Sequence, residues 1–273
     1  MTGEIWPRTV LMVGCGNMGG AMLEGWLAGG VGPDRFTIVD PMLPAAPEGV
    51  TLLRDLPAGG RVFDAILLGV KPQMLPDVAP RVAGLVCAET VVLSILAGVE
   101  LESLARHFPQ AGGIVRIMPN LAAAIGKSPI ALAAKGLSDA RREDVTRLME
   151  PLGTPEWLER EAQFDTVTAL AGSGPAFVYR FIDALAAAGV ALGLPRDQSG
   201  RLALAMAEGA ALLAARSEHD PGELARRVAS PGGTTQAGLD VLDRDGALAR
   251  LVEATLRAAR DRSEEMAAAA RQG

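Results

Sequence analysis

A glycine-rich hexapeptide, GCGNMG at residues 14–19, constrains the fold of this chain more than any other feature. It follows an apolar run at residues 9–13 directly and leads into a helical segment at residues 18–28. Its glycines have the spacing G-x-G-x-x-G: the first allows a tight turn, the second lets backbone approach a pyrophosphate, and the third lets helix and strand pack closely. A purely structural turn is the alternative, but the order strand, loop, helix favours a dinucleotide site. The predicted contacts are Gly14, Cys15, Gly16, Asn17, Met18 and Gly19.

Short apolar runs alternate with helical segments through the first half of the chain. This alternation predicts an α/β fold with a Rossmann-type doubly wound parallel sheet. From residue 162 onward the spacing of apolar residues is helical throughout, which predicts an all-helical second half. A length of 273 residues allows one large domain or two, and the change of pattern favours two, at residues 1–160 and 161–273. The expected strands are residues 9–13, 36–39, 65–70, 90–95 and 113–117, and the main helices of the second half are 175–192, 196–216, 222–229, 234–243 and 248–270.

The helices of the second half carry few charges. Residues 184–194 and 202–206, for example, are almost free of them. A helix that is apolar around much of its circumference needs partners on several sides, and the second half of one chain offers few. We therefore expect a homo-oligomer.

Charge and cysteine usage narrow the partners and the compartment. The chain has 26 Lys and Arg against 32 Asp and Glu, a net charge of −6, so nucleic acid is not an expected partner. Cys15 and Cys87 form no metal-binding spacing, which predicts reduced thiols and no metal. We find no signal-peptide pattern and no apolar stretch that could span a bilayer, so a cytoplasmic protein without a membrane partner is expected.

Asp40 ends the second expected strand, 21 residues after Gly19. A carboxylate there can accept hydrogen bonds from the adenosine ribose and would repel a 2′-phosphate, which favours NADH over NADPH. Alternatively, Asp40 and Pro41 only begin a loop. Arg54 could lie nearby and soften this selectivity, so NADPH or dual use stays open.

The ends of the next three expected strands carry further candidates for the nucleotide site, because the carboxyl ends of parallel strands share one edge of the sheet. Val70, Lys71 and Pro72 follow the third strand, although they could also form an ordinary strand exit. Ala97 follows the fourth strand and Asn120 the fifth, where a small or amide-bearing side chain suits a nicotinamide ring.

Two segments of the second half are rich in glycine and hydroxyl residues, which helix packing alone does not explain. The sequence LAGSGPA at residues 170–176 predicts a Gly-Ser-Gly loop before a helix, although a plain helix boundary would also explain it. The sequence SPGGTT at residues 230–235 runs a hydroxyl-rich loop into a helix whose first N–H groups could bind a carboxylate or phosphate. His107 and His219 are not expected to act as acids or metal ligands.

Together these segments resemble the pyrroline-5-carboxylate reductase family. The likeness rests on GCGNMG, VKPQ, RIMPN, LAGSGPAF and above all on residues 228–243, which resemble the family signature. It implies a Rossmann domain, a helical dimerisation domain, and dimers that often assemble into decamers. It also implies hydride transfer from NADPH or NADH to the C=N bond of 1-pyrroline-5-carboxylate, giving L-proline.

The resemblance assigns roles to named residues of this sequence. Thr235 would be the catalytic residue, and its hydroxyl would form a hydrogen bond to the ring nitrogen of the substrate. The substrate carboxylate would lie on the backbone N–H groups of Gly233 and Thr234, at the start of the helix expected at residues 234–243. The implied substrate-binding residues are Ser230, Gly232, Gly233, Thr234, Thr235 and Glu161.

Two rival functions stay open. Another reductase, such as an imine reductase or a 3-hydroxyacid dehydrogenase, would share the first half. It should carry a catalytic Lys or Asp in the helical half, and no Lys follows Glu161. A dinucleotide-binding sensor without catalysis is the other rival.

Overall fold

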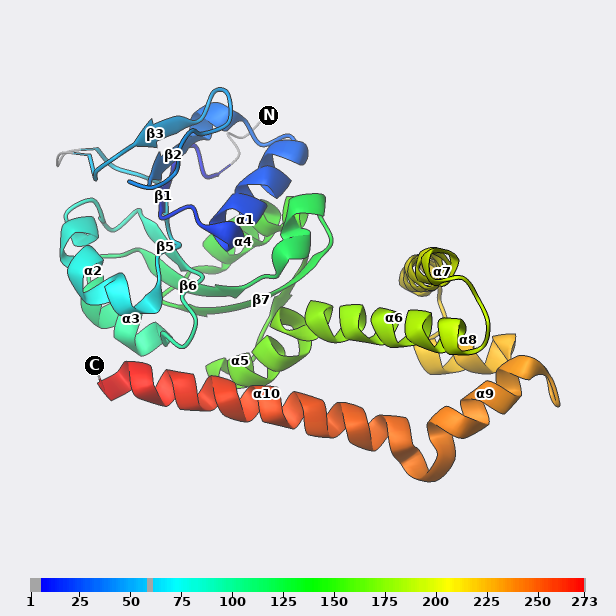
Figure 1. Cartoon of the computed structure of the whole chain (residues 1–273). Helices are drawn as coiled ribbons and strands as arrows, with labels where there is room; N and C mark the ends of the chain where they lie inside the picture. The colour runs from blue at the N-terminus through cyan, green and yellow to red at the C-terminus, as the bar shows by residue number, and fades with distance from the viewer. Residues whose placement is uncertain (1–5, 58–60, 273) are drawn as a thin grey trace. The chain divides into compact units, whose positions relative to one another are not determined.

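The computed structural model describes residues 6–57 and 61–272, with side chains up to residue 268. The chain divides into two compact units (Figure 1): Met1–Gly172 together with Ala259–Gly273, and Ser173–Ala258. The predicted domain boundary between residues 160 and 161 stays a prediction. The two compact units meet at a different residue, and the last helix contributes to both of them.

The first unit is built on one sheet. Its described residues form eight strands in the order β3-β2-β1-β4-β5-β6-β7-β8, in which all neighbours are parallel except the antiparallel pair β6 and β7. The first six positions have the order of a dinucleotide-binding sheet, in which the sequence order of the strands reverses between the parallel neighbours β1 and β4. The strands are β1 (Val10–Val13), β2 (Phe36–Val39), β3 (Thr51–Leu53), β4 (Ala65–Leu68), β5 (Val91–Ser94), β6 (Gly113–Met118), β7 (Ser128–Lys135) and β8 (Gly153–Trp157).

Helices cover both faces of the sheet, as the doubly wound fold requires. On one face α1 (Asn17–Ala28) and α4 (Asp139–Met149) pack against the strands around Trp26, which is fully buried. On the other face lie α2 (Leu75–Ala83), α3 (Leu101–His107) and the short α5 (Phe164–Val167). Successive side chains of β1 alternate between the two cores, so both faces of this strand are buried.

The five strands expected from apolar runs are present, with ends that shift by up to two residues. Three strands were missed. Both β3 and β8 have partly exposed side chains, and β8 contains Pro155, so neither shows a continuous apolar run. Three helices of the first unit were not predicted either: α2 contains Pro76 and Pro80, α4 is predominantly polar, and α5 is only four residues long. The missed strand β7 reverses direction and extends the sheet beyond β6.

The second unit contains only helices among its described residues, as expected. They are α6 (Gly174–Ala191), α7 (Arg196–Arg216), α8 (Pro221–Val228), α9 (Thr234–Asp243) and the first part of α10 (Ala247–Gln272). The predicted Gly-Ser-Gly loop is wrong. Residues Thr168–Gly172 form a π-helical turn and only Ser173 bends before α6 begins, because glycine and small residues tolerate a widened turn as readily as a loop.

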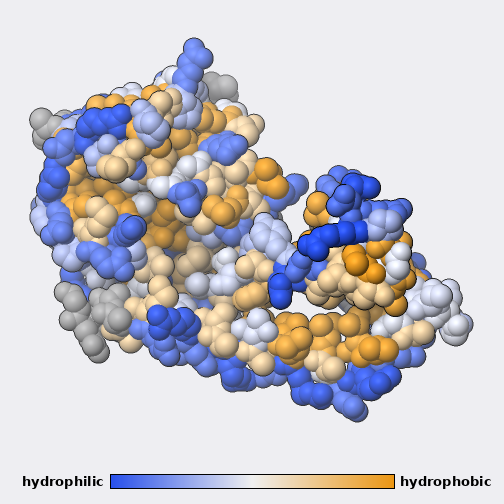
Figure 2. Space-filling model, viewed as in Figure 1, coloured by the Kyte–Doolittle hydropathy of each residue, from blue (hydrophilic) through white to orange (hydrophobic). Residues whose placement is uncertain are grey.

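Apolar side chains of the second unit remain exposed within one chain. Only Ser199 and Ala203 are buried on α7, whereas Leu202, Met206 and Leu213 are more than half exposed. Figure 2 shows apolar side chains gathered over these helices. No helix among the described residues is long and apolar enough to cross a membrane.

Candidate active site

The glycine-rich turn between β1 and α1 shows a different reason for each of its three glycines. Gly14 has φ +86°, and a Cβ placed on it would lie 2.9 Å from the backbone N of Val70. A Cβ on Gly19 would lie 3.2 Å from the carbonyl oxygen of Gly14. These two glycines are therefore required by the fold itself.

Gly16 is the exception, because nothing lies within 4 Å of the position its Cβ would occupy. Its φ of −72° and ψ of −163° suit any residue. The protein's own packing thus gives no reason for glycine here, whereas close approach of a pyrophosphate does. Gly16 also caps α1, no side chain caps this end within the described structure, and no acidic residue lies in the first turn. The N–H groups at the start of α1 suit an anion.

The Asp40 carboxylate fastens this turn to the end of β2. Its Oδ2 accepts a hydrogen bond of 2.9 Å from the Cys15 N–H, and its Oδ1 accepts from the N–H groups of Met42 (2.8 Å) and Leu43 (3.2 Å). Partial burial alone would raise the pKa of Asp40, but these three hydrogen bonds, with Arg54 nearby, lower it below its usual value. One acceptor position on Oδ2 remains for a ribose hydroxyl.

Arg54 closes the loop that follows β2. Its guanidinium donates to the carbonyl oxygens of Asp40 (3.2 Å), Pro41 (3.4 Å) and Pro44 (3.3 Å), and also to that of Leu43. The cation thus organises the loop beside Asp40.

Burial raises the pKa of the Cys15 thiol to about 11, and the negative charge of Asp40 adds to this effect. The thiol is therefore protonated and unreactive at neutral pH.

The ends of β1, β4 and β5 meet beside the glycine turn. A Cβ on Gly69, which follows β4, would lie 2.6 Å from the Gly14 carbonyl oxygen and 3.7 Å from Cδ1 of Ile95. Lys71 begins the short turn Pro72–Met74, and its exposed side chain has no ion-pair partner among the described residues. Ala97 is exposed in the turn after β5. The predicted residues Gly14, Val70 and Lys71 therefore share one edge of the sheet.

Asn120 is buried, and both ends of its amide are bonded. Its Oδ1 accepts from the Ala122 N–H and its Nδ2 donates to the Ala171 carbonyl oxygen, each at 2.9 Å. Its backbone N–H donates to Ser128 Oγ at 2.8 Å. Asn120 thus ties the end of β6 to the π-helical turn, and contact with a nucleotide stays a prediction.

Glu161 also has partners within the first unit. Its Oε1 accepts hydrogen bonds from the Arg116 guanidinium (2.6 Å) and from the Leu101 N–H at the start of α3 (2.7 Å). Arg116 is only 6% exposed and stacks on the Phe164 ring, with 4.2 Å from Cζ to the ring centroid. No role for Arg116 was predicted from the sequence. A single arginine inside the apolar strand GIVRIM was the available signal, because a buried guanidinium requires a carboxylate partner.

In the second unit, residues 230–233 form a turn that leads into α9. Gly232 has φ +71°, and the Gly233 N–H donates to the Ser230 carbonyl oxygen at 2.9 Å. The Gly233 N–H is therefore engaged, which corrects the expectation that it receives an anion. The N–H groups of Thr234, Thr235 and Gln236 begin the helix, and no side chain caps them among the described residues. The Thr235 side chain is exposed.

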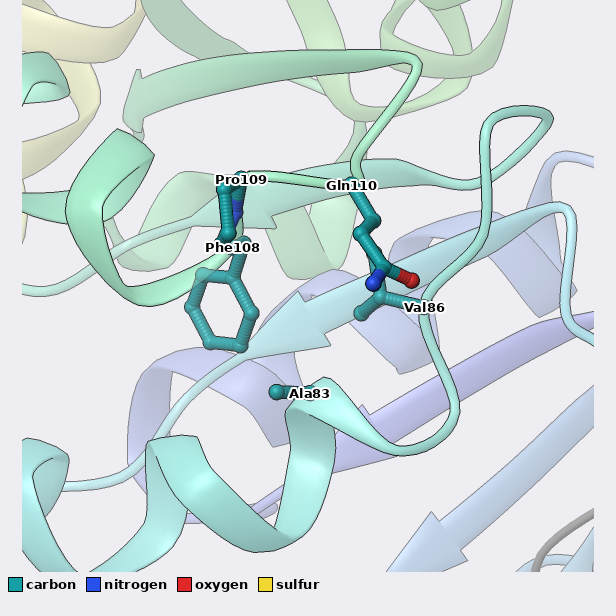
Figure 3. A pocket seen from close by; sticks show the side chains of 5 residues that line it. All are labelled: Ala83, Val86, Phe108, Pro109 and Gln110. Carbon is teal, nitrogen blue, oxygen red and sulfur yellow. The ribbon is translucent and has the colours of Figure 1, made fainter.

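One shallow hollow of about 80 Å³ lies elsewhere, between α2 and the end of α3 (Figure 3). Its lining is largely apolar, and it contains none of the candidate site residues. Ala83, Val86, Phe108, Pro109 and Gln110 form it.

Comparison with known proteins decides the family. Residues 161–266 match the family model described as pyrroline-5-carboxylate reductase dimerisation. The chain is 36% identical over 267 residues to the pyrroline-5-carboxylate reductase of Pseudomonas aeruginosa, an alignment that covers 96% of this chain and 97% of the relative. This chain belongs to the pyrroline-5-carboxylate reductase family.

Solved structures of pyrroline-5-carboxylate reductases share the fold. The Coxiella burnetii protein is 28% identical with a TM-score of 0.88, covering 94% of this chain and 98% of that one. The Plasmodium falciparum protein, solved with NADP bound, is 24% identical with a TM-score of 0.80, covering 97% of this chain and 100% of that one. The Rossmann-type sheet followed by a helical dimerisation region is thus confirmed as the architecture of this family member.

Proposed function

We propose that this chain reduces 1-pyrroline-5-carboxylate to L-proline, using NADPH or NADH. The observation that carries the proposal is the relation to a curated pyrroline-5-carboxylate reductase over almost the whole length of both chains. The reaction adds a hydride to the carbon of the ring C=N bond and a proton to its nitrogen. The reduced nicotinamide supplies the hydride when it is bound.

The residues of the first unit fit a dinucleotide. The turn Gly14–Gly19 would hold the pyrophosphate against the start of α1, since Gly16 leaves its side open and the helix end is uncapped. Asp40 would accept a ribose hydroxyl on the free position of Oδ2, which favours NADH, while Arg54 offers a positive charge beside the same loop. Val70, Lys71, Pro72, Ala97 and Asn120 would contact the nicotinamide half.

The start of α9 would bind the substrate. Its N–H groups at Thr234 and Thr235 suit the carboxylate, and the Thr235 hydroxyl would hydrogen-bond to the ring nitrogen. Ser230, Gly232 and Gly233 shape the turn that exposes these groups. A protonated imine is already electrophilic, so orientation contributes more here than a strong acid would. Glu161 would act on the pocket through the segment it holds with Arg116.

We further infer a homodimer as the minimal active assembly, with decamers as a larger form, and a cytoplasmic location. The dimerisation model over residues 161–266 and the exposed apolar side chains of α7 support the dimer. The two free cysteines are consistent with a reducing compartment.

The direct test mixes the purified chain with 1-pyrroline-5-carboxylate and either NADH or NADPH. Oxidation of the nucleotide is measured as the loss of absorbance of the reduced nicotinamide. Formation of L-proline in equal amount is expected. A folded protein that binds a dinucleotide but consumes neither reduced form would contradict the proposal and favour a sensor.

Thr235→Ala should lower kcat roughly tenfold to hundredfold, because one hydrogen bond to the reacting ring is lost. The affinity for the dinucleotide should not change. Thr235→Ser keeps the hydroxyl and serves as the matched control, with activity close to that of the parent. Unchanged steady-state kinetics of Thr235→Ala would remove this residue from the mechanism.

A further inference from the structure

The last turns of α10 pack on the turn that follows β5. Ala267 is only 6% exposed. A Cβ placed on Gly98 would lie 3.3 Å from the Ala267 Cα and 3.4 Å from its backbone N, and Gly98 has φ +73°. Glycine is required at this position both for the backbone conformation and for the close approach of the helix.

A second contact joins the same part of α10 to α5. The Ser263 hydroxyl donates a hydrogen bond of 2.7 Å to Asp165 Oδ1, across 98 residues of sequence. The neighbouring Phe164 is 2% exposed and shares a core cluster with Leu96, the first residue of the turn after β5, and with Val99, which follows this turn. In Figure 1 the C-terminal end of α10 runs beside α5. Both contacts therefore pack the end of α10 against the turn after β5 or against residues that support this turn.

This turn continues the sheet edge that holds the glycine-rich loop. It follows β5, the neighbour of β4, and Ile95 at its start reaches within 3.7 Å of the position a Cβ on Gly69 would occupy. In a doubly wound sheet, the loops at this edge line the crevice that receives a dinucleotide. The turn lies on the β4 side of β1, away from Asp40, and so away from the adenosine half.

We propose that Ser263 and Ala267 are positioning residues, which hold the turn Leu96–Gly98 in place for the nicotinamide half of the dinucleotide. This inference rests on the proposed function for the identity of the ligand. The end of α10 does not touch the glycine-rich loop in any described contact, so its effect is specific to one half of the ligand.

The test compares two ligands that differ in the nicotinamide. Dissociation constants for NADH and for ADP-ribose, which lacks the nicotinamide ring, are measured by calorimetry on the full chain. The variants are Ser263→Ala, which removes the hydrogen bond, and Ala267→Leu, which adds bulk against Gly98. Ser263→Thr keeps the hydroxyl. Glu264→Leu adds an apolar side chain on an exposed position of the same turns and is the matched control.

For Ser263→Ala, the dissociation constant of NADH should rise roughly threefold to tenfold, the effect of a single lost hydrogen bond. Ala267→Leu should raise it too, because the added bulk displaces the turn at Gly98. The dissociation constant of ADP-ribose should stay the same for both variants. Ser263→Thr and Glu264→Leu should resemble the parent for both ligands. Equal weakening of both ligands, or no change for either, would overturn the proposal.

Two further measurements keep the proposal testable if a variant fails to fold or the parent is inactive. If Ala267→Leu does not fold, Ser263→Ala and Asp165→Ala should each raise the dissociation constant of NADH by the same factor. The double variant Ser263→Ala with Asp165→Ala should raise it no further, because both substitutions remove the same hydrogen bond. Absence of turnover by the parent protein would reject the proposed function, yet the ratio of the two dissociation constants would still report on the turn.

Discussion

Asp40 has two tasks at the scale of a single residue. It bonds three backbone N–H groups, which join the glycine-rich turn to the loop after β2, and it retains one acceptor position beside the predicted ribose site. Because these bonds favour the charged form, the folded protein holds the pKa of Asp40 below its unfolded value. The carboxylate therefore stabilises the fold, and we predict that it also selects the ligand.

Asp40→Asn should reduce the stability of the protein at neutral pH and raise the use of NADPH relative to NADH. A group with a lowered pKa contributes stability above its unfolded pKa, about 3.9 for Asp, and loses it as the pH falls through the lower folded value. The difference in unfolding temperature between parent and variant should thus be constant near pH 7 and shrink below about pH 4.

Glu48→Gln removes an exposed carboxylate from the same loop and is the control. Glu48→Gln should have the same unfolding temperature as the parent at each pH, and the same ratio of kcat/KM for NADPH and NADH. An unaltered nucleotide ratio for Asp40→Asn would show that the carboxylate does not face the ribose.

At the scale of elements, the junction of β1 and α1 contains glycines that the fold requires and one for which only ligand binding gives a reason. Gly14→Ala should destabilise the protein by about 1–3 kcal/mol, because φ of +86° is strained for alanine and the methyl group would crowd Val70. Gly16→Ala should leave the unfolding temperature nearly unchanged, since its Cβ meets open space.

Although Gly16→Ala should leave the stability of the protein unchanged, it should weaken dinucleotide binding. Its methyl group would keep a pyrophosphate away from the backbone and weaken binding roughly tenfold or more, the cost of a lost hydrogen bond to a charged group. Thermal unfolding and equilibrium binding on the same samples check both statements. Gly20→Ala, a helix position that is also free of neighbours within 4 Å, is the control.

The elements that could be predicted from the sequence are those whose signal is local. The strands β1, β2, β4 and β5 are buried along their whole length, so each appears as an apolar run. The edge strand β8 has half-exposed residues, and α2 contains prolines, so their formation depends on neighbours that the sequence does not place. The glycine spacing predicted the loop after β1 for the same local reason.

The partners of site side chains could not be predicted in this way. Asp40 bonds to Cys15 from 25 residues away and Asn120 bonds to Ala171 from 51 residues away. Both residues looked available for a ligand, and the structure shows them engaged in holding loops together. Such engagement follows from the folded arrangement and leaves no pattern along the chain.

At the scale of the whole molecule, the helical unit is incomplete as a single copy. Leu202, Met206 and Leu213 have the spacing of one stripe along α7, which lies next to the buried Ser199 and Ala203. Such a stripe requires a second apolar surface, and a dimerisation region supplies one from another copy of the chain.

Light scattering coupled to size exclusion should therefore find a dimer or a multiple of it, and no stable monomer. Met206→Glu should shift the protein to smaller or unfolded species, because a charge would be buried in the interface. Glu208→Gln on the same helix should keep the assembly of the parent. A well-folded monomer of the parent chain would contradict this prediction.

The path of the chain between the two units affects the order in which the protein can fold during synthesis. Because Ser263 and Ala267 contact Asp165 and Gly98, the first unit needs residues that follow the helical unit in the sequence. The ribosome makes these residues only after those of the helical unit. We therefore expect the turn after β5 to gain these two contacts only once the helical unit has been translated.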